Sequence, residues 1–115
     1  MTMTTLKPIL LAGLAALAAC GATPDLYPVA SPEVTQTQSI AFRALEVRDV
    51  SLPDYASANE IAVQDETGKL VTDTSVLWAD NPGRAVTLEL ARNLGRLSGA
   101  RVAPEPWPFD SFADA

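Results

Sequence analysis

The chain has 115 residues, 48% of them apolar, with 8 basic residues against 14 acidic ones. This length allows one small domain, and the acidic balance argues against nucleic-acid binding, which needs a clustered positive field. The sequence has no histidine and a single cysteine, so it lacks the commonest general base and metal ligand and cannot form an internal disulfide framework. We therefore predict a protein that is not an enzyme, with no catalytic residues, no cofactor and no metal.

The first twenty residues are typical of an export signal that ends in a lipid-attachment site. Lys7 gives a short positive region, an apolar run follows over 9–19, and small residues precede Cys20. This is the layout of a secretory signal peptide, and the run is shorter than the ~20 apolar residues that a membrane-spanning helix needs. The segment Leu17-Ala18-Ala19-Cys20 resembles the bacterial lipobox.

That resemblance implies a signal peptide over 1–19 and a diacylglyceryl group on the sulfur of Cys20. The next residue is Gly21 rather than aspartate, and by the same resemblance this favours the outer membrane. Two or more acyl chains anchor a protein stably, at ~0.8 kcal/mol for each buried CH₂. We therefore expect a lipid-anchored domain that faces the periplasm from the outer membrane.

Residues 20–39 are predicted to form an extended linker after the lipidated cysteine. The segment carries three prolines and many serine and threonine residues, with little periodicity. Its candidates for docking onto a core are Tyr27 and Val29, and Pro28 restricts such docking to an edge strand.

A strand is predicted from Ile40 to the residues before Pro53, because apolar residues alternate with polar ones along it. The alternation changes phase before Leu45, which indicates a bulge near Ala44. Residues 54–60 are then expected to be a polar connection.

A β-hairpin is predicted over about 60–72. The short apolar runs Ile61-Ala62-Val63 and Leu70-Val71 flank the segment Asp65-Glu66-Thr67-Gly68. This segment has turn chemistry, with Gly68 free to adopt a positive φ.

A helix follows, with both of its ends marked in the sequence. Asp80 or Asn81 can cap its start, Pro82 suits its first turn, and Gly99 provides a stop. A strand over 101–103 comes next. The helix carries one apolar stripe at helical spacing, made of Val86, Leu90, Leu94 and Leu97.

These elements predict an α+β domain over 40–115, with a small antiparallel or mixed sheet of about three to four strands and one amphipathic helix packed on it. Three aromatic residues are candidate partner contacts, because aromatic side chains are enriched at interfaces. They are Tyr55, Trp78 and Trp107. The alternative for the tryptophans is packing against the helix ends, and for Tyr55 a half-buried place in a turn.

Seven segments in order resemble the PqiC-like auxiliary lipoproteins of ABC-type transport systems. Ala56 and Asn81-Pro82-Gly83 depart from the family pattern, and family members continue past the last segment into a second strand-and-helix unit. The resemblance therefore covers nearly the whole chain but about the first half of the family's domain. The segments are the lipobox at Cys20, Leu26-Tyr27, Val50-Ser51-Leu52-Pro53-Asp54-Tyr55, Asn59-Glu60-Ile61-Ala62-Val63, Leu77-Trp78-Ala79-Asp80, Leu90-Ala91-Arg92-Asn93-Leu94-Gly95 and Pro106-Trp107-Pro108.

The resemblance implies a non-catalytic accessory of an MCE-type lipid transport system that helps to maintain the membrane barrier. It implies as partners an MCE-domain transport protein with its ABC permease complex, a membrane reached through the lipid anchor, and further copies of the chain in a homo-oligomer. A stand-alone structural or assembly lipoprotein, with the same anchor and a different partner, is the alternative.

Overall fold

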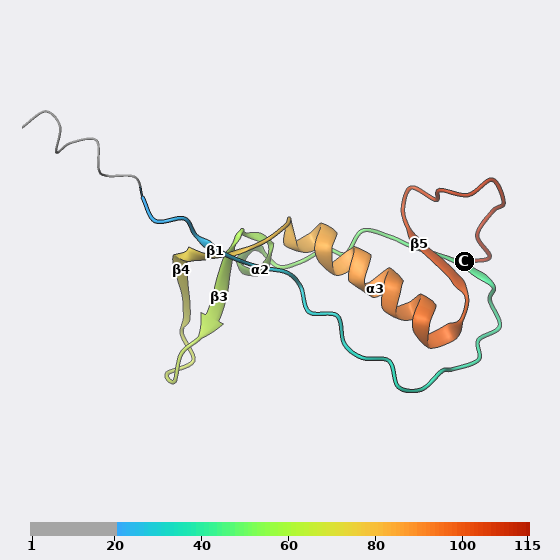
Figure 1. The fold of residues 1–115 in the computed structure, drawn as a ribbon, viewed down its shortest axis with the longest axis horizontal. Coiled ribbons are helices and arrows are strands. Elements are labelled where there is room, and N and C mark those ends of the chain that lie inside the picture. The colour runs from blue at the N-terminus through green and yellow to red at the C-terminus, as the bar shows by residue number, and fades with distance from the viewer. Residues whose placement is uncertain (1–20) are drawn as a thin grey trace, which may run out of the picture.

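The computed structural model describes residues 21–115, so the predicted signal peptide and Cys20 lie outside the described residues. The described part confirms the α+β class, with two separate sheets (Figure 1). In one sheet the strand order is β1-β4-β3, and in the other β2 pairs with β5. The elements in chain order are β1 (Asp25–Tyr27), β2 (Ala44–Val47), α2 (Asp54–Ser57), β3 (Glu60–Gln64), β4 (Leu70–Trp78), α3 (Pro82–Ser98) and β5 (Arg101–Pro104).

The helix predicted after Asp80 is confirmed as α3, and its caps explain its bounds. The side chain of Asn81 accepts a hydrogen bond from the backbone N–H of Arg84, and Pro82 occupies the first turn, where a missing N–H costs nothing. At the other end Gly99 adopts a left-handed conformation (φ 69°) and its N–H donates to the carbonyl of Gly95. Glycine takes this conformation without a Cβ clash.

α3 packs on the two-stranded sheet rather than on the three-stranded one. Its fully buried positions on this face are Thr87 and Ala91, each 2% exposed, one residue beyond members of the predicted stripe. Leu90 of that stripe is 41% exposed, so the stripe is not the buried centre of the helix. Toward its C-terminal end the helix faces β5, where a Cβ on Gly95 would make an ordinary van der Waals contact of 3.8 Å with the Cβ of Val102.

β2 is shorter than the strand predicted from Ile40. Ile40 and Phe42 precede it and are exposed. Its parallel register with β5 is continuous from Ala44, paired with Arg101, to Val47, paired with Pro104. The predicted bulge near Ala44 is therefore wrong.

The hairpin prediction is confirmed by β3 and β4, which pair antiparallel on either side of a turn in which Gly68 has φ 87°. β4 is longer than expected and continues to Trp78. The register is interrupted between Glu60 and Ala62, which pair with Leu77 and Thr72. The extra residues of β4 form a bulge, so its first part pairs with β3 alone and its last part pairs with both β1 and Glu60 of β3.

The segment predicted as a linker also contacts the folded body. β1 pairs in parallel with the end of β4. Further along, the N–H of Gln38 donates to the carbonyl of Leu97 (2.7 Å), and Arg96 donates to the hydroxyl of Ser31 (3.0 Å). The chain between β1 and β2 therefore crosses α3 instead of extending freely. The polar connection predicted over 54–60 contains the short helix α2.

Candidate partner-binding surface

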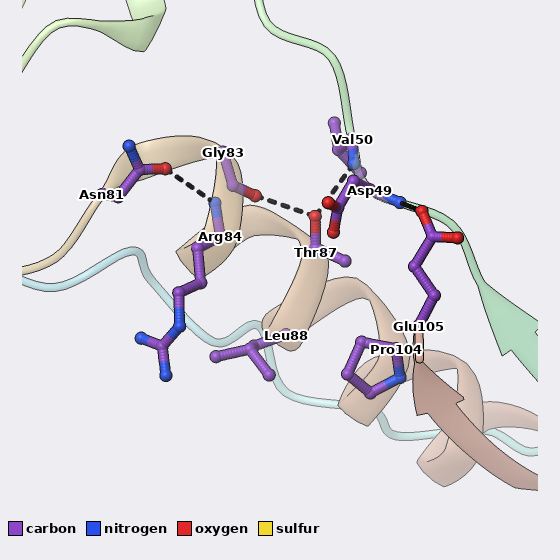
Figure 2. A pocket seen from close by; sticks show the side chains of 9 residues that line it. All are labelled: Asp49, Val50, Asn81, Gly83, Arg84, Thr87, Leu88, Pro104 and Glu105. Carbon is purple, nitrogen blue, oxygen red and sulfur yellow. Dashed lines mark hydrogen bonds between the residues drawn. The ribbon is translucent and has the colours of Figure 1, made fainter. Parts of the chain in front are cut away.

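A pocket of about 420 Å³ lies where the first turns of α3 meet the chain after β2 and β5 (Figure 2). The Oγ1 of Thr87 joins these segments, because it accepts a hydrogen bond from the N–H of Val50 (2.9 Å) and donates one to the carbonyl of Gly83 (2.8 Å). The pocket is lined by Asp49, Val50, Asn81, Gly83, Arg84, Thr87, Leu88, Pro104 and Glu105.

Two polar side chains of this pocket, those of Thr87 and Glu105, link separate segments of the fold. Glu105 Oε1 accepts the N–H of Asp49 (2.8 Å), while its Oε2 lies 3.8 Å from Nε of Arg48. Both hydrogen-bond partners of the Thr87 hydroxyl are backbone groups. A hydroxyl that acts as a nucleophile is instead activated by an adjacent base. Within residues 21–115, no group of three or more histidine, cysteine or acidic side chains is placed to hold a metal ion.

The C-terminal tail is attached along the outer edge of β2. The Oδ2 of Asp114 accepts hydrogen bonds from the N–H groups of Arg43 (2.7 Å) and Ala44 (3.0 Å), and these bonds lower the pKa of Asp114. Ala115 accepts the N–H of Glu46 (2.8 Å). The tail thus covers backbone groups that an edge strand would expose.

The three predicted contact residues are not brought together. Tyr55 lies on α2 and is 58% exposed. Trp78 is half-buried at the end of β4, in register with Tyr27. Trp107 lies in the tail that follows β5, and Figure 1 shows β4 and this tail at opposite ends of the described molecule.

Trp107 is largely committed to the tail. Its backbone N–H donates to Glu46 Oε1 (2.9 Å), its indole N–H donates to the carbonyl of Ser111, and its ring makes an edge-to-face contact with Phe109 at 5.0 Å. Trp107 thus packs within its own tail, and its role as a partner contact stays a prediction. Tyr55 has the free surface that a contact needs.

The β3–β4 hairpin carries exposed apolar residues that the sequence did not mark as a site. Val63 and Val71 face each other across the two strands and are 57% and 41% exposed. The only signal for this in the sequence was a hairpin with apolar residues on both strands and no neighbouring element assigned to cover them. Other exposed apolar residues of the same region are Leu26, Tyr27, Tyr55 and Leu70.

The part of the sequence that contains this apolar pair is acidic. Between 54 and 75 the chain has five carboxylates and one basic residue, Lys69, so the segment has a net charge of −4 (1 − 5). The hydroxyl of Thr67 donates to Asp65, and this bond contributes most to a lowered pKa of Asp65. A hydrogen bond from the hydroxyl of Ser75 does the same for the pKa of Asp73. These two groups stay ionised at neutral pH.

The chain belongs to the family of ABC-type transport auxiliary lipoprotein components, whose model matches residues 26–114. The match takes in nearly all of the folded body, from β1 to the tail. No curated protein and no solved structure matched the chain. Within the described residues, no helix has the length and apolar character needed to cross a membrane. Family membership gives the protein an accessory role in ABC-type transport and associates it with a membrane as a lipoprotein.

Proposed function

We propose that the protein is anchored in the outer membrane through lipid on Cys20 and acts in the periplasm as a non-catalytic accessory of an MCE-type lipid transport system. The observation that carries this proposal is the family match over 26–114, which begins six residues after Cys20, the last residue of the predicted export signal and lipobox. The signal peptide then comprises 1–19, and the family domain begins inside the segment first assigned as linker.

The arrangement of polar and apolar groups supports a binding role. Two polar side chains of the pocket at α3, Thr87 and Glu105, are engaged in hydrogen bonds to the chain after β2. Apolar side chains on α2 and on the hairpin are exposed instead. An accessory protein needs a surface that another protein can cover, and exposed apolar residues within a polar rim are typical of such surfaces.

The partners in this proposal are an MCE-domain protein and its ABC permease complex, and self-association into a homo-oligomer is part of it. The cellular role is lipid movement between membranes in support of barrier integrity. Deletion of the gene should therefore increase sensitivity to detergent. Unchanged sensitivity would contradict the role in barrier integrity.

The proposal is tested by purifying the lipidated, tagged protein from gently solubilised membranes and identifying the co-purified proteins by mass spectrometry. We expect an MCE-domain protein together with its permease. Cys20→Ser is the control for the anchor: it should leave the protein outside the membrane fraction in a flotation assay. Recovery of the lipoprotein without transport components would contradict the proposal and favour the stand-alone structural role.

A further inference from the structure

The β3–β4 hairpin has an apolar face that nothing in the described structure covers. None of residues 60–75 is fully buried. Val63 and Val71 are directly opposite each other, so their side chains lie on one face of the hairpin. In Figure 1 the hairpin projects away from α3 and the two-stranded sheet.

The hairpin is held in shape by its own side chains. At its tip Asp65 Oδ1 accepts hydrogen bonds from the N–H groups of Thr67 (2.8 Å) and Lys69 (3.0 Å), and Gln64 Nε2 donates to the carbonyl of Gly68 (3.0 Å). An isolated two-stranded hairpin is only marginally stable in water. These bonds therefore present the apolar face in a fixed geometry, which lowers the entropy cost of binding.

Side-chain hydrogen bonds also hold the base of the hairpin, within β4. Within β4 the Oδ1 of Asp73 accepts hydrogen bonds from the N–H (2.8 Å) and the hydroxyl (2.6 Å) of Ser75. This local bonding lies where the register of β4 with β3 is interrupted, between Thr72 and Leu77. The base of the hairpin, like its tip, is thus held by hydrogen bonds to an aspartate side chain.

The negative charge of the hairpin indicates which kind of partner could cover its apolar face. A second copy of the hairpin, residues 60–75, would bring a net charge of −3 (1 − 4) against another of the same charge, and an anionic bilayer would be repelled as well. A protein surface with an apolar centre and basic residues around it matches both features.

Resting on the proposed function, we propose that the β3–β4 hairpin, centred on Val63 and Val71, is the docking surface for a protein of the transport complex that presents an apolar centre within a rim of arginine and lysine. The apolar pair supplies the buried contact, and the surrounding carboxylates orient the partner.

The first test compares recovery of the transport complex by the wild type and by two variants in the full lipidated chain. Val63→Asp combined with Val71→Asp should lower recovery by about tenfold or more, because charge replaces the desolvated centre. Glu66→Lys, in the exposed turn, should lower it by about threefold to tenfold through the rim. Phe112→Asp is the matched control, since Phe112 is 94% exposed in the tail, and it should leave recovery unchanged.

The outcomes separate this inference from the proposed function. If the wild type recovers no transport protein, the proposed function fails. If the wild type recovers the complex and the double variant recovers it equally well, the proposed function stands and the hairpin inference is overturned. Circular dichroism melting of each variant shows whether a loss of recovery reflects unfolding.

A photo-crosslinking experiment tests the occupant without altering charge. Benzoylphenylalanine in place of Val63 should crosslink to a protein of the transport complex in intact cells. A crosslinked product of twice the chain's mass would overturn the inference in favour of a second copy. Crosslinking to lipid alone, or no crosslinking at all, would overturn it too.

Discussion

The unit formed by α3, β2 and β5 and the β3–β4 hairpin are stabilised in different ways. All fully buried side chains of residues 21–115 belong to the first unit. The hairpin has none and is held by its strand pairing and by hydrogen bonds between side chains and its own backbone. The difference separates the part that stabilises the fold from the part that presents a surface. The buried residues of the first unit are Val47, Pro82, Thr87, Ala91 and Ala103.

The largest expected difference between the two regions comes from the same substitution made in each. Val47→Ala should lower the free energy of unfolding by about 2 kcal/mol, because Val47 is buried and its removal leaves a cavity. Val63→Ala, at an exposed position, should lower it by less than about 0.5 kcal/mol. Urea denaturation of both variants measures these values. Equal losses would show that the hairpin belongs to the same cooperative core.

A second matched pair concerns a hydrogen bond rather than packing. Thr87→Val keeps the shape of the side chain but leaves the N–H of Val50 without its acceptor, which should cost about 1–2 kcal/mol. Thr74→Val, on the exposed part of β4, should change stability by less than about 0.5 kcal/mol. Thermal and urea unfolding provide the comparison. A neutral Thr87→Val variant would mean that this bond does not join the strand to the helix.

Local chemistry explains which parts of the fold could be predicted from the sequence. The caps at Asn81 and Gly99 and the turn at Gly68 are determined by a few neighbouring residues, and all three are confirmed. The division into two sheets depends on contacts between distant segments. Alternation at Ile40 and Phe42 predicted a strand there, but strand formation requires a pairing partner, and β2 begins only at Ala44, opposite Arg101.

The candidate site was less predictable than the fold. Aromatic character identified Tyr55, Trp78 and Trp107, but residue type does not reveal whether a ring finds neighbours of its own, as Trp107 does with Phe109. The hairpin was predicted, yet its exposure depends on where α3 packs. Cys20 was recognised from a purely local pattern, and its lipidation stays a prediction.

The smallest expected effect is a pH dependence confined to the hairpin. Hydrogen bonds hold the pKa of Asp65 below its ordinary value of 3.8. Because the folded pKa is the lower one, the contribution of Asp65 to stability is complete above the ordinary value and is lost as the pH falls through the folded pKa. Acidification from about pH 5 to pH 2 should therefore shift the amide resonances of Thr67 and Lys69.

Asp65→Asn isolates this effect from the other acidic groups. Asp73 on β4 also has a lowered pKa, and so do Glu89 and Asp114 outside the hairpin, so acid alone perturbs the unit around α3 as well. The asparagine keeps an acceptor oxygen but does not titrate, so the acid-induced shifts of Thr67 and Lys69 should disappear while those near Asp114 persist. If the shifts at Thr67 and Lys69 persist in this variant, Asp65 does not control the shape of the hairpin tip. The two regions would then respond to acid as one body.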